Sequence, residues 1–192
     1  MILKALYDYY HRSGNLPIMG MELKEIGFII VIDKCGNFLR FEDRRIDKKS
    51  AQQFLVKKSV GRSSVANYLY DNSQYVFGYS DKGDMESMRK YFDTFKAKVE
   101  EIYDMFSDNE TMQAVYAFYQ QEPSDIVEAM QNDSLWDDIN KNLNKKYSTF
   151  SFLIEGDTEI VASKRKLINL ESGGNDVGGG LCLVIGKHSK TV

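Results

Sequence analysis

The chain has 192 residues, of which 43% are hydrophobic and 28% are charged. This length and composition suffice for one good core, or for one core with a helical subdomain, and they exclude wholesale disorder. No apolar run approaches the ~18 to 20 residues of a membrane span, and the first residues carry no basic stretch or cleavage site of a secretory signal. We therefore expect a cytoplasmic protein with no membrane partner.

Two cysteines and two histidines limit the chemistry that the chain can support. Cys35 and Cys182 are far apart and lack metal-ligand spacing, so we expect two reduced thiols, no disulfide and no metal site. Neither His11 nor His188 lies near a nucleophile with the spacing of a hydrolase triad. We predict a protein that is not an enzyme, with no catalytic residues and no cofactor.

The net charge of −3 hides two segments of opposite charge. Residues 34–66 hold nine lysines and arginines against three acids, whereas residues 101–138 hold ten acids and no lysine or arginine. A basic segment attracts nucleic acid, and an acidic segment is repelled by it. We therefore expect an oriented binder whose acidic segment faces solvent or a protein partner.

The first part of the chain predicts a helix followed by a β-hairpin. Apolar residues recur at helical spacing over residues 2–12, which predicts a short amphipathic helix. The apolar run Phe28–Ile32 is followed by turn residues at 34–37 and by a second apolar stretch at 38–41, which predicts a hairpin. Residues 43–49 are charged, and we expect them to form the exposed exit of this hairpin.

The middle of the chain, around residues 84–145, predicts a helical insertion. Apolar residues between 85 and 106 alternate in steps of three and four, which predicts one long helix. Its large aromatic residues favour packing into a globular core over a coiled coil. Shorter helices are expected over 111–121, 124–132 and 135–144, with Ser124 as the N-cap of the second of these helices.

The last part of the chain predicts a return to short strands. Residues 149–155 end at a Gly-Asp turn, across which we expect residues 159–162 to pair back. The glycine-rich segment 172–180 predicts a flexible loop or hinge before a final strand over 181–185. The order of strands, helices and strands indicates an α+β fold. We predict three regions: a basic α+β region over 1–83, an acidic helical insertion over 84–146, and strands over 147–192 that complete the first region.

The segment 57–78 is the strongest candidate for binding. Lysines and arginines neutralise phosphates, and Lys57, Lys58 and Arg62 fit this role. Hydroxyl and amide groups reach base edges, and a tyrosine such as Tyr68 or Tyr70 can stack on a base or insert at a base step. We predict a nucleic-acid-binding site of eight residues: Lys57, Lys58, Ser59, Arg62, Ser63, Ser64, Asn67 and Asn72.

The same segment has a simpler interpretation. Charged surface loops are common, and in such a loop the tyrosines would belong to the core and the asparagines would cap turns. From residue chemistry alone this interpretation is favoured. The chain would then be a protein-interaction scaffold without direct DNA contact, whose acidic helices dock a basic partner.

Five sequence elements, in order along the chain, reverse this preference. They are MILKALYDYY at the start, GFIIVIDKCGNF at 27–38, the basic block VKKSVGRSS at 56–64, DNSQYVFG at 71–78 and CLVIG at 182–186. Together they resemble the N-terminal region of one family, the large subunit of the type I-C CRISPR Cascade complex. Members of this family continue beyond the last element, so we expect an N-terminal fragment of such a subunit.

The resemblance implies a function and partners. In this family the N-terminal region recognises the protospacer-adjacent motif in duplex DNA and helps to start R-loop formation, while guide pairing reads the rest of the target. The implied partners are target double-stranded DNA, crRNA, the other Cascade subunits and a helicase-nuclease recruited to the complex. The positions that match the family are Lys57, Ser59, Val60, Arg62, Ser64, Asp71, Asn72, Tyr75 and Gly78.

Overall fold

The computed structural model describes residues 20–59, 61, 65–81 and 83–168, together with the backbone of 179–182 and 187–190. The helix expected over 2–12 lies outside the described residues, and so do Arg62, Ser63 and Ser64 of the predicted site. Within the described part, helices and strands occur together with mixed strand directions, which confirms the predicted α+β fold.

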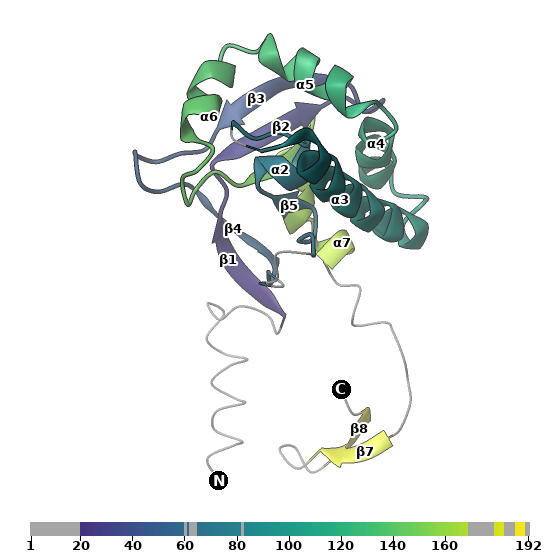
Figure 1. The fold of residues 1–192 in the computed structure, drawn as a ribbon. Helices are drawn as coiled ribbons and strands as arrows, with labels where there is room; N and C mark the ends of the chain where they lie inside the picture. The colour runs from purple at the N-terminus through teal and green to yellow at the C-terminus, as the bar shows by residue number, and fades with distance from the viewer. Residues whose placement is uncertain are drawn as a thin grey trace.

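A four-stranded mixed sheet forms the centre of the fold (Figure 1). Its order is β3 (Phe38–Asp43), β2 (Phe28–Ile32), β6 (Phe150–Ile154) and β5 (Tyr70–Asp71). The neighbours β2 and β6 are parallel, whereas β3 and β5 run antiparallel to them at the two edges. Every residue of β2 and β6 is buried, as is typical of parallel strands that are covered on both faces.

The predicted hairpin of β2 and β3 is confirmed, and one aspartate fixes its turn. Asp33 Oδ1 accepts hydrogen bonds from the backbone N–H groups of Cys35 and Asn37, each at 2.8 Å. Between them Gly36 has φ +83°, a left-handed conformation that glycine adopts without the steric cost of a Cβ atom. The turn therefore depends on both its aspartate and its glycine.

Helices pack against this sheet. The long helix α3 (Met85–Met105) crosses in front of the sheet in Figure 1 and packs on the short helix α2 (Ser73–Val76). Farther along, α4 (Glu110–Phe118) contacts β2 and β6, α5 (Pro123–Gln131) contacts β3, and α6 (Trp136–Asn142) contacts α5. The predicted core packing of the long helix is confirmed, because five apolar residues along it are buried: Met88, Phe92, Phe95, Val99 and Ile102.

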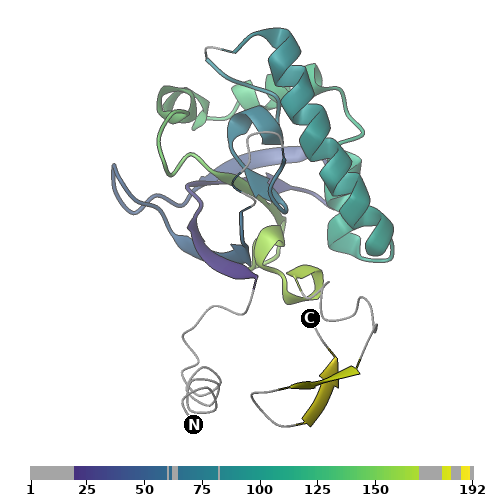
Figure 2. The same ribbon diagram turned by 60° about the horizontal axis from the view of Figure 1, so that its bottom comes forward.

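Two smaller strand pairs form outside the central sheet. In the first, β1 (Met21–Glu25) and β4 (Gln53–Lys57) are antiparallel, and Figure 2 shows this ribbon, with β1 in purple, curving away from the central sheet. The sequence did not predict either strand, because MELKE and QFLVK mix charged, polar and apolar residues and contain no apolar run longer than three residues. In the second pair, β7 (Gly179–Cys182) is antiparallel to β8 (Lys187–Lys190).

Two expectations about local structure are wrong, and a third falls mostly outside the described residues. Residues 159–162 do not form a strand that pairs back on β6, because β2 and β5 already occupy both edges of β6. Instead, Val161–Ser163 forms a 3₁₀ helix, which is followed by α7 (Arg165–Ile168). The N-cap of α5 is Glu122 rather than Ser124, because Pro123, which has no N–H, takes the first helical position. Of the predicted glycine-rich loop, residues 172–178 lie outside the described residues, and the last two, 179–180, belong to β7.

None of the described helices combines the length and the apolar character that crossing a lipid bilayer requires. The longest of them, α3, carries charged residues along much of its exposed side, for example Arg89, Lys90 and Asp93. Its apolar side is already occupied by the core of the domain.

Candidate nucleic-acid interface

Part of the positive charge of residues 34–66 is neutralised within the fold. Arg45 forms ion pairs with Asp43 and with Asp138 of α6, and Lys34 forms one with Glu110 of α4. Two of these carboxylates belong to the acidic segment, so the two oppositely charged segments touch in the fold. Four cations of residues 34–66 have no ion pair with any described residue: Lys48, Lys49, Lys57 and Lys58.

The basic loop that follows β4 starts from a fixed point. The backbone N–H of Lys58 donates to the carbonyl just before β1 at 2.8 Å, and that of Ser59 donates to Glu22 Oε1 at 3.0 Å. The hydroxyl of Tyr70 donates to the carbonyl of Lys57 at 2.7 Å. Burial opposes ionisation of Glu22, but hydrogen bonds from Ser59 and Tyr70 hold its pKa below the ordinary value. The start of the basic loop is therefore bonded to both β1 and β5.

The expectation that Tyr68 or Tyr70 could stack on a base is wrong. Their side chains belong to the core, with 8% and 0% of their surface exposed. The hydroxyl of Tyr68 donates to the carbonyl of Leu167 at 2.7 Å, and the ammonium group of Lys57 lies 4.4 Å from the centroid of the Tyr68 ring. The simpler interpretation of these two tyrosines, as core residues, is confirmed.

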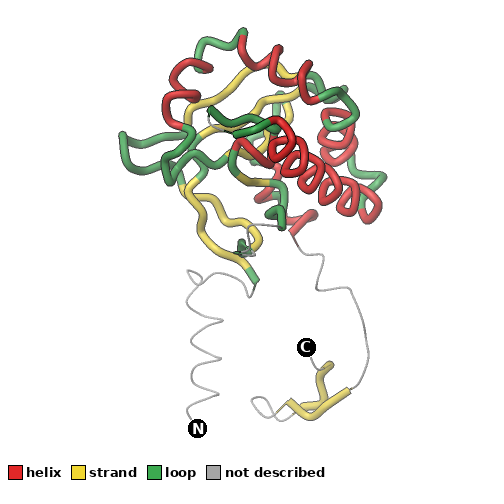
Figure 3. The backbone as a smooth tube through the Cα atoms, in the orientation of Figure 1, coloured by secondary structure: helices red, strands yellow, loops and turns green. Residues whose placement is uncertain are grey.

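A polar groove of about 330 Å³ is linked to the start of this loop through Tyr70, which lines the groove and bonds to the carbonyl of Lys57. Its lining includes Asn67 and Asn72 of the predicted site, Lys145 and Lys146, and Lys24 of β1. Its flanks at 65–69 and 143–149 are turns and loops rather than helix or strand, as the green tube in Figure 3 shows. The remaining lining residues are Tyr70, Asp71, Leu143, Asn144, Ser148 and Thr149.

The lining of this groove is cationic. Its three lysines form no ion pair with a described residue, and the only carboxylate among the lining residues, Asp71, is 7% exposed. Such a lining favours an anionic ligand such as a phosphate. The amide side chains of Asn67, Asn72 and Asn144 add hydrogen-bonding groups of the kind that can bond to a base edge. The groove therefore brings together phosphate-binding and base-reading chemistry.

Asp71 holds one wall of the groove in place. Its Oδ2 accepts hydrogen bonds from the backbone N–H and from Nδ2 of Asn67, both at 2.9 Å, and its Oδ1 accepts one from the backbone N–H of Asn72 at 2.8 Å. Asn72 is the N-cap of α2, and its Oδ1 accepts from the N–H groups of Gln74 and Tyr75. Asn72 thus also has the capping role that the simpler interpretation gives to it, and Asn67 is bonded to the buried Asp71.

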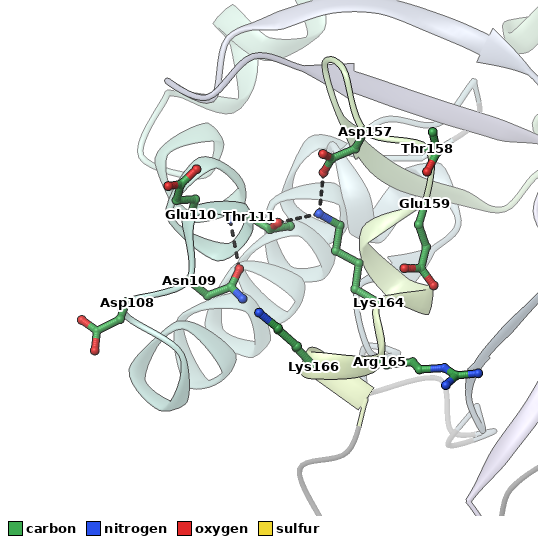
Figure 4. A pocket seen from close by; sticks show the side chains of 10 residues that line it. All are labelled: Asp108, Asn109, Glu110, Thr111, Asp157, Thr158, Glu159, Lys164, Arg165 and Lys166. Carbon is green, nitrogen blue, oxygen red and sulfur yellow. Dashed lines mark hydrogen bonds and ion pairs between the residues drawn. The ribbon is translucent and has the colours of Figure 1, made fainter.

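A second cleft, of about 660 Å³, suits nucleic acid less well. Figure 4 shows Lys164 pointing between Thr111 and Asp157, and it bonds to both. The lining includes four carboxylates against three cations, so its net charge is negative: Asp108, Glu110, Asp157 and Glu159, with Lys164, Arg165 and Lys166. Across the part of the chain that the structure describes, no group of three or more histidines, cysteines, aspartates or glutamates could hold a metal ion.

Comparison with known families assigns the chain. A family model for CRISPR-associated proteins (Cas_Csd1) matches residues 6–192, which is nearly the whole chain. The chain belongs to this family. No curated protein matches it at a significant level. Membership of this family makes it a CRISPR-associated Cascade component that works in a complex with other Cas proteins.

The groove of this CRISPR-associated protein contains three lysines that the sequence pattern did not reveal as site residues. Lys24 lies on β1, which was not predicted, and Lys145 and Lys146 follow α6, far from the basic segment in sequence. The one available signal was the pair of lysines at 145–146, which comes soon after the acidic segment that ends at 138. Of the predicted residues, Asn67 and Asn72 line the groove, Lys57 ends β4, and Lys58 and Ser59 begin the loop that follows it.

Replacing Asp71 by asparagine in this CRISPR-associated protein is expected to remove a pH-dependent loss of stability. Burial raises the pKa of Asp71 above its ordinary value of 3.8, although hydrogen bonds from Asn67 and Asn72 oppose this. The folded chain therefore binds this proton more tightly than the unfolded chain does. The resulting stabilisation is complete below the unfolded pKa and is lost as the pH rises through the folded pKa.

Urea unfolding of both proteins between about pH 4 and pH 8 measures this effect. The free energy of unfolding of Asp71→Asn minus that of the parent chain should increase with pH and then level off. Taking the difference removes the contributions of other carboxyl groups, since these titrate in both proteins. A difference that stays flat or falls with pH would show that Asp71 is not a destabilised carboxylate.

Proposed function

We propose that this chain is the N-terminal part of the large subunit of a type I-C Cascade complex. In this role it binds target double-stranded DNA at the protospacer-adjacent motif and helps to start R-loop formation. It acts in the cytoplasm, without catalysis of its own, together with crRNA, the other Cascade subunits and a recruited helicase-nuclease. Membership of the CRISPR-associated family and the five ordered sequence elements support this proposal.

The observation that carries the DNA-binding proposal is the cationic groove. Lys24, Lys145 and Lys146 lie around a wall whose amide groups are fixed by hydrogen bonds. In protein–DNA complexes, contacts to phosphates set the register of the protein, and contacts to base edges select the sequence. A short motif needs only a few base contacts, because guide pairing reads the rest of the target. The groove contains both kinds of group within one small volume.

The basic loop that follows β4 extends the phosphate contacts in this proposal. Replacing both Lys58 and Arg62 by alanine is expected to reduce the slope of log affinity against log salt concentration by about 2, since each phosphate contact contributes about 0.9. Fluorescence anisotropy of target duplexes with the assembled complex, between about 50 and 200 mM salt, measures the slope. As a matched control, Lys90→Ala with Lys96→Ala removes two lysines of α3 and should leave it unchanged. An unchanged slope in the loop variant would remove the loop from the interface.

A protein-interaction scaffold is the second candidate function. It is favoured by exposed carboxylates on and beside the helices, namely Asp104, Asp108, Asp125, Glu128 and Asp137. In a scaffold these groups dock a basic partner, and the groove lysines serve only solubility. Two measurements distinguish the two functions. In a scaffold, charge reversal of the carboxylates weakens assembly of the complex. In the proposed DNA-binding role, neutralising the groove lysines weakens DNA binding.

A further inference from the structure

We propose that Asn72 presents a hydrogen-bond donor, and no acceptor, to the groove, so that the groove binds an acceptor atom of the nucleic acid. The inference rests on the proposed function and specifies the chemistry of its site. Asn72 is exposed and lines the groove, while its neighbour Asp71 is buried beneath it. An asparagine amide normally offers both an acceptor and a donor, so the restriction to a donor needs a structural cause.

The cause is the N-cap of α2. The backbone N–H groups of Gln74 and Tyr75 approach the Asn72 amide at 3.0 and 3.4 Å. A backbone N–H can only donate, so the amide atom that faces the two groups is Oδ1, and this fixes the orientation of the amide. The oxygen is committed to the helix, whereas Nδ2, at the other end of the amide, has no acceptor among the described residues.

The backbone of Asn72 is held as firmly as its amide oxygen. Its N–H donates to Asp71 Oδ1 at 2.8 Å, and its carbonyl accepts from the N–H of Val76 at 3.0 Å. Because both backbone groups and the amide oxygen are bonded, the position of Nδ2 is fixed before any ligand arrives. A donor that is already in position loses little conformational freedom on binding, which favours both affinity and selectivity.

The charged side chains of the groove lysines also offer only hydrogen-bond donors. Lys24, Lys145 and Lys146 carry ammonium groups, which donate hydrogen bonds and accept none. The matching atoms in DNA are phosphate oxygens and the acceptors of base edges, namely N7 and O6 of guanine, N7 of adenine and O4 of thymine in the major groove. The exocyclic amino group of cytosine is a donor and would face another donor at Asn72. The inference therefore names an acceptor and excludes an amino group at this position.

Two substitutions separate the donor from the cap. Aspartate and serine are as good at an N-cap as asparagine, so Asn72→Asp and Asn72→Ser should keep α2 and the melting temperature of the chain. Both lack the amide donor, and Asn72→Asp has nearly the same shape as the original side chain. We expect each variant of the assembled complex to bind target duplex roughly 3- to 10-fold more weakly, as for the loss of one hydrogen bond.

The negative charge of aspartate needs its own control. Gln74→Glu adds the same charge two residues away, in the first turn of α2, and Gln74 does not line the groove. We expect this variant to bind nearly as well as the parent complex. If Asn72→Asp and Gln74→Glu weaken binding equally and Asn72→Ser does not, charge alone explains the loss and the inference is wrong.

A panel of duplexes that differ only beside the guide-matched sequence identifies the acceptor. A loss of affinity on every duplex places a phosphate oxygen at Asn72, and a loss only on the preferred duplex places a base acceptor there; both results support the inference. Normal binding by both Asn72 variants overturns it. In that case DNA binding by a variant with neutralised Lys24, Lys145 and Lys146 tests the proposed function separately. If this variant binds target duplex more weakly, the proposed function stands although the inference about Asn72 fails.

Discussion

Replacing Lys24, Lys145 and Lys146 together by glutamine is expected to lower the affinity of the assembled complex for target duplex DNA by roughly 100-fold at about 0.15 M salt. Each neutralised phosphate contributes about 0.9 to the slope of log affinity against log salt concentration, which amounts to about fivefold per contact at this salt concentration. Loss of three contacts should therefore also reduce the slope of log affinity against log salt concentration by about 2.7. Because the three side chains are at least partly exposed and have no ion pair with a described residue, the fold should tolerate the change.

The same number of charges can be removed elsewhere as a control. Lys34, Lys90 and Lys96 do not line the groove, so their replacement by glutamine changes the net charge equally without touching the proposed site. Filter binding or fluorescence anisotropy of the two triple variants at several salt concentrations gives both affinity and slope. If the two variants lose affinity to the same extent, the groove has no special role, and general charge accounts for DNA binding.

Replacing Gly36 by alanine is expected to lower the free energy of unfolding by roughly 3 kcal/mol or more. A side chain in this left-handed conformation costs about 1 to 2 kcal/mol, and overpacking adds about 1 to 3 kcal/mol. A Cβ atom at Gly36, where φ is +83°, would come to 2.8 Å from the carbonyl oxygen of Ala114 and closer still to the backbone nitrogen of Phe118. These are backbone atoms of α4 and its end, so the helix would have to move away from β2.

Gly156 provides the matched control for this effect. Its φ is +89°, close to that of Gly36, but nothing lies within 4 Å of the position where a Cβ atom would stand. Gly156→Ala should therefore show the backbone cost alone, about 1 to 2 kcal/mol. Urea unfolding of both variants separates the two contributions. Equal losses of stability would mean that α4 does not pack tightly on the turn after β2.

Much of the fold could be predicted from local pattern. The apolar run Phe28–Ile32 and the turn after it gave the hairpin, and the steps of three and four between residues 85 and 106 gave α3 close to its observed bounds. These elements follow from side-chain periodicity and turn chemistry, which need no knowledge of distant residues. The ribbon of β1 and β4 was missed because its stability comes from pairing between segments about 30 residues apart rather than from an apolar run.

The candidate site was predicted only in part. Asn67 and Asn72 were identified from the composition of their segment, and they line the groove. The lysines that complete the lining were missed, because residues 145–146 are brought there by the end of the helical insertion. Tyr68 and Tyr70 were misread as stacking residues, since composition does not reveal which way a side chain points.

The sequence by itself determined the family, the α+β class, the hairpin turn and the long helix, because each is encoded by residues close together in the chain. The tertiary structure alone decided which cations are unpaired, since ion pairs such as Arg45 with Asp138 join residues that are far apart in sequence. It also decided that β5 pairs antiparallel with β6, with Asp71 opposite Phe150, and this pairing brings residues 143–149 beside Asn72. A binding groove depends on such juxtaposition, and juxtaposition follows from how the whole core packs rather than from any one segment.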